Sequence, residues 1–582
     1  MSSSSSGSAS AGPPWRAALA VGAVAGAVLA SRGRARSSCA TTATASSSSS
    51  CSASASSSTS MSSKLPDAAL YSARLEKLGE PFSATSSQTY LVPDEERQPD
   101  AWKRTNLDYG PKVDVLNRGK SKLVIVLVGK PGRAKTYFAH KLTRYLCWVR
   151  YAARCFTYGE IRDRLFGKYQ PPDFFAATNE AGVAKRDAVC REALAQCMAY
   201  LEGGGEVGVL DGTNTSRKRR DFIRQTLQGD AGVGVDGGLA KQPAMGVELL
   251  FVECICEDPA LVAANLRSRV AAPEYANRPE PGLASDAGRM ADFERRVAQY
   301  AGYESLQEDE GQRVQVYDFG RKTVLGGIAG YLPTRVVSFL INLNALPKRV
   351  FLTRHGESMN NVKELIGGDP GLSPHGQRYA ARLGEFIGAH DAAHEGGGKM
   401  QVWSSTMRRT LETSRCLAGG LTPPRTVVKW RCLQEIDVGI CDSLTYKQVE
   451  ERWPDEFAAR AKDKLRYRYP RGESYLDIID RLEPVIFELE RQRDPVVVVA
   501  HQAVLRCLYS YFGNLEPHSV PFLKIPLHEV IEIIPRAYGC SEKRHALMAV
   551  DKKSEVSQGG AVPVFGGAAA TAAAVNPGTG AT

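Results

Sequence analysis

Two runs of consecutive apolar residues constrain the fold of this chain more than any other feature. Residues 123–128 read L-V-I-V-L-V, and Val496–Ala500 is equally uninterrupted. Runs of this kind are typical of strands buried on both faces, as in parallel sheets covered by helices. A glycine-containing turn follows the first run, and His501 follows the second. Because open α/β sheets bind ligands at the carboxyl ends of their strands, each run predicts a functional site.

The length and the patterning predict two folded units. The 582 residues exceed one ordinary core, and two blocks each alternate strand-like and helix-like patterns. The expected units are residues 86–345 and residues 346–552. Strands are expected at residues 123–128, 207–210, 247–255, 314–317, 350–353 and 496–500. Low-complexity composition predicts disorder over residues 1–85 and 553–582, and residues 230–246 are predicted to form an inserted surface loop.

The positive charge is concentrated at the start of the chain. The net charge is +11, and no Asp or Glu precedes Asp67. Arg16, Arg32, Arg34, Arg36 and Lys64 contribute +5 to this leader, which leaves about +6 for the remainder. No Lys/Arg run with interleaved aromatic residues is present. The balance therefore favours an enzyme that handles anions over a nucleic-acid-binding protein.

The cysteines and the leader bear on the compartment. Thirteen cysteines are scattered without CxxC pairs or zinc-ligand spacing, which indicates a reducing, cytoplasmic location. No stretch reaches the roughly 20 apolar residues that span a bilayer, so no membrane partner is expected. Residues 17–30 are apolar and lie within the Ser-rich, acid-free leader. This leader resembles an organelle-targeting segment, and a low-complexity tail without an address remains the alternative.

The turn after residues 123–128 has the pattern of a phosphate-binding loop. Residues 129–136 read G-K-P-G-R-A-K-T and precede an expected helix. In this context Lys135 would reach the β- and γ-phosphates of a nucleotide, and Thr136 would hold Mg²⁺. Ala134 stands where the pattern has glycine, and its side chain is expected to crowd the nucleotide. Asp211, at the end of another apolar run, suits a position near Mg²⁺ or a substrate hydroxyl, or alternatively a helix cap.

The second block opens with a motif that predicts nucleophilic catalysis. Residues 352–361 read L-T-R-H-G-E-S-M-N-N, directly after the strand-like start of the block. A lone histidine after a strand is more often a core residue than a nucleophile, but the combined R-H-G-E pattern is far rarer. A neutral imidazole of His355 could attack phosphorus, while Arg354 stabilises the charge on the phosphoryl oxygens.

Several further segments resemble one known family. Residues 211–220 (D-G-T-N-T-S-R-K-R-R), 141–146 (K-L-T-R-Y-L) and 253–259 (E-C-I-C-E-D-P) are similar to segments of the bifunctional 6-phosphofructo-2-kinase/fructose-2,6-bisphosphatases, whose loop reads G-L-P-A-R-G-K-T. The resemblance covers about residues 120–550. It implies an α/β fold with a P-loop NTPase-like parallel sheet domain followed by a histidine phosphatase, or phosphoglycerate-mutase-like, domain.

For the first domain, the resemblance implies transfer of the ATP γ-phosphoryl group to the 2-hydroxyl of fructose 6-phosphate, with Mg²⁺ held by Thr136 and Asp211. Asp211, Lys135 and Cys256 carry over as active-site residues. ATP contacts carry over to Gly129, Gly132, Lys135, Thr136, Tyr137, Asn265 and Tyr538. Fructose 6-phosphate contacts carry over to Arg162, Arg186, Thr213, Arg219, Arg269, Arg296 and Tyr300. Arginines suit this role because their planar forks bind phosphate bidentately.

For the second domain, the resemblance implies metal-free hydrolysis of fructose 2,6-bisphosphate through a phosphohistidine. His355 is the nucleophile, Arg354, Arg409 and His501 surround the phosphoryl group, and Glu435 is the general acid, which must hold a proton near neutral pH. The rest of the substrate is addressed by Asn361, Gly367, Tyr446, Arg460, Lys464, Tyr475, Gln502 and Arg506. This set favours a sugar bisphosphate over the three-carbon acids of mutases.

Three functional hypotheses remain open at this stage. The first is a bifunctional enzyme that controls glycolysis and gluconeogenesis. The second is mainly a fructose-2,6-bisphosphatase with a kinase weakened by Ala134. The third is a scaffold that binds sugar phosphates without turnover, which the complete set of catalytic residues disfavours. Small-molecule sugar phosphates and ATP are the expected partners, and relatives form homodimers through the kinase half.

Overall fold

A computed structural model describes residues 122–229, 246–270, 285–300, 302–344, 348–393, 399–536 and 539–549. These described residues all belong to one compact unit. The expectations for residues 1–85 and 553–582, nearly all of the 230–246 loop, and Tyr538 lie outside the described residues. Among the residues described, no helix is both long and apolar enough to cross a membrane.

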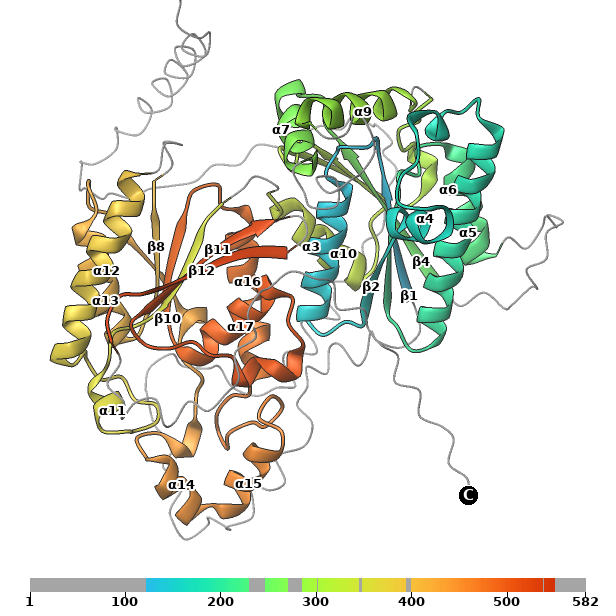
Figure 1. Ribbon diagram of the computed structural model, residues 1–582. Coiled ribbons are helices and arrows are strands. Elements are labelled where there is room, and N and C mark those ends of the chain that lie inside the picture. The colour runs from blue at the N-terminus through green and yellow to red at the C-terminus, as the bar shows by residue number, and fades with distance from the viewer. Residues whose placement is uncertain are drawn as a thin grey trace, which may run out of the picture. The chain divides into compact units, whose positions relative to one another are not determined.

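The first domain contains a six-stranded sheet in the order β2-β3-β1-β4-β5-β6 (Figure 1). All neighbouring strands are parallel except β5 and β6. The strands are β1 (Lys122–Val128), β2 (Ala153–Thr157), β3 (Val207–Asp211), β4 (Val247–Ile255), β5 (Arg313–Tyr317) and β6 (Lys322–Gly326). The helices are α3 (Lys135–Trp148), α4 (Tyr158–Phe166), α5 (Glu180–Glu202), α6 (Arg217–Gln228), α7 (Pro259–Val270), α9 (Asp286–Ala298) and α10 (Tyr331–Asn342).

The second domain contains a sheet in the order β12-β11-β7-β10-β8-β9. Strands β7 to β10 pair in parallel, and β11 and β12 extend the sheet antiparallel. The strands are β7 (Val350–Arg354), β8 (Gln401–Ser405), β9 (Val427–Trp430), β10 (Val496–Ala500), β11 (Glu529–Arg536) and β12 (Gly539–Ala546). The helices are α11 (Met359–Val362), α12 (Pro374–Ala392), α13 (Arg408–Gly420), α14 (Tyr446–Arg452), α15 (Pro454–Lys462), α16 (Tyr475–Arg491) and α17 (Gln502–Gly513).

Helices cover both faces of each sheet, which confirms the α/β class. Alternate residues of β1 face opposite sides: Leu123 and Ile125 join the core with α3 and α10, whereas Val124 and Val126 join the core with α5 and α6. In the second sheet, one face packs against α16 and α17 and the other against α12 and α13. Burial on both faces explains why the central strands are uninterrupted apolar runs.

Helix α3 also contacts the second domain through buried polar groups. Lys141 Nζ lies 2.6 Å from Glu490 Oε1, and both side chains are buried. Lys348 and the Tyr511 hydroxyl donate to the same carboxylate. Burial works to raise the pKa of Glu490, but the two ammonium groups outweigh it and lower that pKa. The helix that begins at the predicted phosphate loop is therefore tied to the core of the second domain.

Candidate active sites

The second sheet brings the two histidines that were predicted to be catalytic close together. Strands β7 and β10 are adjacent and parallel, with Ala500 opposite Arg354, so His355 and His501 leave neighbouring strand ends. Their ring centroids are 5.2 Å apart, and both residues are buried. His501 Nε2 lies 3.0 Å from the Ser405 hydroxyl at the end of β8. Three parallel strands thus supply one compact site at their carboxyl ends.

Hydrogen bonds orient the His355 ring. Its Nδ1 lies 2.7 Å from the Gly356 carbonyl oxygen, which only a protonated Nδ1 can satisfy. Arg409 Nε donates to His355 Nε2 at 3.1 Å. Nε2 is therefore the nitrogen that carries the lone pair. This nitrogen points toward the arginine that would bind a phosphoryl group.

Electrostatics keep both rings neutral. Burial, and then the positive charges of Arg409 and Arg354, hold the pKa of His355 well below its usual value. Burial and then Arg409 lower the pKa of His501 in the same way. A neutral imidazole is the reactive form for attack on phosphorus. The arginines thus favour the nucleophilic state before substrate arrives.

The two arginines remain charged despite their burial. Burial lowers the pKa of Arg354 to about 10, and Glu435 opposes that effect. Arg354 donates to the Ile525 carbonyl, and Arg409 Nη1 donates to the Gly368 carbonyl at 2.8 Å. Fixed cations of this kind stabilise charge on equatorial phosphoryl oxygens without reorganising.

Glu435 lies at the N-terminus of α17. Its carboxylate accepts backbone N–H bonds from Gln502 at 3.1 Å, Ala503 at 3.2 Å and Ile436 at 3.0 Å. Three donors and a helix N-terminus suit the ionised carboxylate, as required of a base. The role of Glu435 as the general acid stays a prediction.

A pocket lined by Glu435 contains most of the predicted sugar-phosphate residues. Its cations are Arg460, Lys464 and Arg506, and its other predicted members are Gly367, Tyr446, Tyr475 and Gln502. Arg460 Nε donates to the Tyr469 hydroxyl at 2.7 Å, and Arg506 Nη1 donates to the Tyr475 hydroxyl at 3.0 Å. Burial, with Arg460 and Arg506, lowers the pKa of Lys464 to about 7. Two of the three cations bond to uncharged tyrosine hydroxyls and not to carboxylates, so the pocket has positive charge to bind a phosphate dianion.

Two predicted residues shape the loop beside this pocket. Gly367 has φ 69°, and a Cβ there would lie 1.9 Å from Asp442 Oδ1, so the position requires glycine. Asn361 closes a capping box with Ser358 at the start of α11. Its side-chain oxygen accepts from the Ser358 backbone N–H at 2.9 Å. The backbone of this loop therefore has a fixed path past the site.

The loop between β1 and α3 has the path of a phosphate cradle. Gly129 passes so close to the Cys254 carbonyl that a Cβ would lie 2.5 Å from its oxygen. Gly132 has φ 75°, and its carbonyl accepts from Asn265 Nδ2 at 2.7 Å. Ala134 adopts left-handed geometry, with φ 59° and ψ 14°. Glycine adopts this region freely, whereas alanine is strained there.

Strand β3 brings its acid beside this loop. Gly129 N–H donates to the Thr213 carbonyl, and Asn214 Nδ2 donates to the Leu127 carbonyl, both at 2.9 Å. Asp211 is buried. Burial raises the pKa of the Cys254 thiol, the positive charge of Lys135 lowers it, and the negative charge of Asp211 raises it. Lys135 Nζ donates to the Lys130 carbonyl at 2.7 Å, within the loop itself.

The predicted fructose 6-phosphate residues converge on Tyr300. The pKa of this buried phenol is raised by burial, while a hydrogen bond to Thr213 and the charges of Arg186, Arg162 and Arg296 lower it. Arg296 also lies over the ring of Phe175, 5.5 Å from its centroid. The arginines come from α4, α5 and α9, and Arg219 on α6 donates to the Arg186 carbonyl. Arg269 is near the end of α7, but its side chain lies outside the described part.

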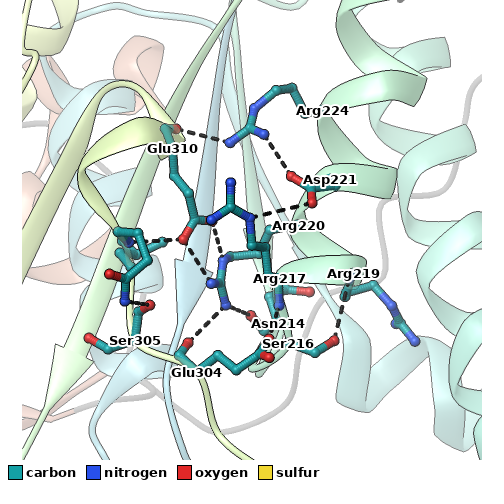
Figure 2. A network of polar contacts seen from close by, with 12 residues as sticks. Asn214, Ser216, Arg217, Arg219, Arg220, Asp221, Arg224, Glu304, Ser305 and Glu310 are labelled. Atoms are coloured by element: carbon teal, nitrogen blue, oxygen red, sulfur yellow. Dashed lines mark hydrogen bonds and ion pairs between the residues drawn. The ribbon is translucent and has the colours of Figure 1, made fainter.

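Two neighbouring arginines of helix α6, Arg219 and Arg220, make contacts in different directions (Figure 2). Arg220 and Glu310 form a buried pair at 2.6 Å, and Arg220 also donates to the Asn214 carbonyl. Arg219 points away from that network and pairs with Asp187. One arginine of the predicted motif thus holds the loop after β3, and its neighbour is available to the sugar-phosphate cluster.

The remaining predicted kinase residues have the following positions. Cys256 is buried, its backbone carbonyl accepts from Arg133 of the phosphate loop, and burial raises its pKa to about 11. The Tyr137 side chain is buried in the core, and its hydroxyl donates to the Asn344 carbonyl. Thr136 is the second residue of α3, directly after the loop.

Sequence reasoning missed several residues that position the site. Arg481 on α16 donates to the carbonyls of Cys432, Gln434 and Glu435 and so fixes the segment that carries the predicted general acid. Tyr469 and Tyr467 line the sugar-phosphate pocket. No local pattern marks these residues, since Arg481 bonds to segments 46–49 residues away.

Comparisons with known proteins follow the same division of the chain. Residues 112–347 match the family 6-phosphofructo-2-kinase, and residues 350–547 match the histidine phosphatase superfamily, branch 1. A 6-phosphofructo-2-kinase/fructose-2,6-bisphosphatase of Arabidopsis thaliana is 40% identical over 75% of this chain, and the match spans 55% of that relative's length. Isoform 4 from Macaca fascicularis is also 40% identical, over 72% of this chain and 83% of the relative.

The fold and the two sites define a two-domain α/β protein in which a kinase domain precedes a histidine phosphatase domain. The chain belongs to the 6-phosphofructo-2-kinase/fructose-2,6-bisphosphatase family.

Proposed function

We propose that this chain both synthesises and hydrolyses fructose 2,6-bisphosphate, at two separate sites, and thereby sets the balance of glycolysis and gluconeogenesis. The kinase unit is assigned to residues 86–345 and the phosphatase unit to residues 346–552. The observation that carries the substrate assignment is the pocket of Arg460, Lys464 and Arg506, which also contains Glu435. The Glu435 carboxylate accepts from the backbone of Gln502, the residue that follows His501. The family's relatives are named for both activities, which favours two activities over a one-sided enzyme.

In the phosphatase reaction, His355 Nε2 attacks the C2 phosphorus while the bond from phosphorus to O2 breaks. Glu435 donates a proton to O2, and fructose 6-phosphate leaves. Water then attacks the phosphohistidine, Glu435 takes a proton from that water, and inorganic phosphate is released. Arg354, Arg409 and His501 bind the phosphoryl oxygens throughout. The three cations of the sugar pocket hold the 6-phosphate and place C2 opposite His355.

In the kinase reaction, the loop from Gly129 to Thr136 binds the ATP phosphates, and Lys135 contacts the β- and γ-oxygens. Arg162, Arg186, Arg219, Arg296 and Tyr300 hold the 6-phosphate of fructose 6-phosphate. Asp211 orients the 2-hydroxyl and accepts its proton as O2 bonds to the γ-phosphorus and ADP leaves.

The donors for a magnesium ion fit this site. Asp211 is a buried carboxylate at the end of β3, next to the strand that leads to Thr136. Oxygen donors of this kind are the ligands that Mg²⁺ prefers. When bound, the ion neutralises charge on the β- and γ-phosphate oxygens. The proposed compartment is the cytoplasm, and the proposed assembly is a homodimer.

The test compares kcat/KM for fructose 2,6-bisphosphate with that for 3-phosphoglycerate, a substrate of the competing mutase class. The expected preference for the bisphosphate is at least about 100-fold, because a lost phosphate pocket costs several kcal/mol. Arg460→Gln should remove most of this preference for the bisphosphate. Arg466→Gln is the matched control, since Arg466 pairs only with Asp463 outside this pocket. Equal rates for both substrates in the wild type would refute the assignment.

A further inference from the structure

Three potential metal ligands meet in the phosphatase domain away from the two active sites. His390 lies in the last turn of α12, Glu532 on β11 and His545 on β12. Their ligand atoms all lie within 4.8 Å of one another, and His545 Nε2 is 3.1 Å from Glu532 Oε2. The register pairs Val530 with His545 and Glu532 with Lys543. Glu532 and His545 are therefore diagonal neighbours on the sheet face that α12 covers.

The cluster is remote from the phosphatase chemistry. Helix α12 begins at Pro374, where the neighbouring Ser373 hydroxyl donates to Glu357 beside the catalytic loop. His390 is sixteen residues further along, which corresponds to about 24 Å of helix. None of the three ligands touches His355, Arg409 or Glu435 in the described contacts. The proposed reaction therefore gives no reason for two imidazoles and a carboxylate to gather here.

Burial favours the cluster as a ligand set. Glu532 is only 6% exposed, which makes an uncompensated carboxylate costly. Its other oxygen lies 3.5 Å from Arg349, whose side chain is 46% exposed. Phe386 packs against both histidine rings, at centroid distances of 4.6 and 4.8 Å, and restricts their rotation. A pre-oriented, half-buried imidazole pair loses little entropy when it binds a ligand.

Two cations also lie near the cluster. Arg349 contacts the Glu532 carboxylate, and Lys543 is opposite Glu532 in the strand register. Both would weaken cation binding, so the Glu532 carboxylate must supply most of the electrostatic compensation.

We propose that His390, Glu532 and His545 form a binding site for a zinc-class transition-metal ion that ties α12 to the β11–β12 hairpin. Two imidazoles and one carboxylate are donors that select zinc over magnesium or calcium. Bonds of about 2.0–2.2 Å would place the ligand atoms about 3.4 Å apart. The observed separations are 3.1 Å between His545 Nε2 and Glu532 Oε2 and at most 4.8 Å among all three ligand atoms. The fourth position would hold water, because both histidines are partly exposed.

The competing explanation is an ordinary ion pair between Glu532 and a protonated His545, supported by Arg349. It uses the same carboxylate and gives His390 no role as a ligand. The two explanations therefore differ in what happens when His390 alone is changed.

The experiment uses the full chain, stripped with EDTA and then freed of chelator, and measures bound Zn²⁺ by equilibrium dialysis. We expect the wild type to bind one more equivalent than His390→Gln or His545→Gln, or to bind it at least tenfold more tightly. His518→Gln is the control, since His518 is an exposed histidine elsewhere. Any zinc held by the active-site histidines or the cysteines is common to all variants and cancels in the comparison.

A second measurement tests zinc binding even if a substitution lowers the stability of the protein. Thermal unfolding is followed in EDTA and in Zn²⁺, and each variant is compared with itself. Zinc should raise the Tm of the wild type and of His518→Gln, but not that of His390→Gln. Cobalt should give a visible absorption band in the wild type that is absent in His390→Gln. Identical zinc stoichiometry, affinity and Tm shift in wild type and His390→Gln would overturn the proposal and leave the ion pair. Either result is independent of the two proposed activities.

Discussion

The two active sites differ in how much of their chemistry is held in place before a substrate binds. The phosphatase groups lie at the ends of adjacent buried strands, and the Arg409 side chain is only 6% exposed. The kinase arginines come from separate helices, and the side chains of Arg162 and Arg219 are about 20% exposed. Arg186 and Arg219 currently bond to backbone carbonyls and Asp187. The phosphatase groups are preorganised, whereas Arg186 and Arg219 of the kinase must exchange partners when sugar phosphate arrives.

The largest expected effect is at the phosphatase nucleophile. His355→Ala should lower bisphosphatase kcat by at least about 10⁴-fold, since the covalent route is lost. The acid-labile phosphohistidine labelled from substrate should disappear with it. Both are measured by release and trapping of the labelled 2-phosphate.

The same variant sharpens the comparison between the sites. Synthesis of fructose 2,6-bisphosphate from ATP and fructose 6-phosphate should stay within about twofold of wild type, because the kinase residues lie on another sheet. His518→Ala, at an exposed histidine, should change neither activity. A labelled phosphohistidine that survives His355→Ala would assign the nucleophile to another residue.

A smaller loss is expected at the general acid. Glu435→Gln should reduce kcat by about 10²–10³-fold, the usual contribution of proton transfer by one side chain. The amide oxygen can still accept from Ile436 and Ala503, the bond from Gln502 is lost, and the amide neither gives nor takes a proton. If Glu435 serves both steps, the labelled intermediate should also decay more slowly than in wild type.

The matched control is Glu450→Gln, at an exposed glutamate of α14. An unchanged decay of the intermediate in Glu435→Gln would restrict this residue to the first step. It would then remain an acid without being the base.

These assignments show what sequence could and could not predict. His355, His501 and the P-loop follow strands whose residues are buried on both faces, so continuous apolar runs located them almost to the residue. Strand β12 was not predicted, because the edge strand G-C-S-E-K-R-H-A carries polar side chains that need no apolar run. Arg481 was missed because its role depends on tertiary contacts with carbonyls far along the chain. Motifs report the reacting groups, whereas the residues that position them are found only in the fold.

The next effect concerns the cations of the sugar pocket. Lys464 has its pKa lowered to about 7, chiefly by burial. Substrate binds the protonated form, so affinity is full below pH 7 and is lost as the pH rises through that value. Between pH 7 and pH 8, the KM for fructose 2,6-bisphosphate should rise about fivefold with kcat little changed.

The control for this pH effect is Lys464→Arg, which keeps its charge throughout the range. Its KM should be nearly flat between pH 7 and pH 8. An equal rise in both proteins would place the titrating group elsewhere and weaken the contrast between the phosphatase pocket and the kinase arginines.

The smallest expected effect is at Ala134 of the kinase loop. Its left-handed backbone costs alanine about 1–2 kcal/mol, and the lower entropy of unfolded alanine recovers part of that. Ala134→Gly should therefore stabilise the protein by roughly 0.5–1 kcal/mol and raise Tm by about 1–3 °C. Ala195→Gly, at an exposed position inside α5, should instead destabilise by about 1 kcal/mol. Thermal unfolding of the two variants measures both signs.

The activity of Ala134→Gly decides whether this strain matters for catalysis. The Ala134 side chain packs against the apolar core cluster, so its methyl group does not take up space that the nucleotide needs. The KM for ATP should then stay within about twofold of wild type. A tenfold fall in that KM would mean that the methyl group crowds the phosphates, as the sequence pattern alone suggested. The kinase would then be limited by one side chain in its cradle, whereas the phosphatase has no such obstacle among its described residues.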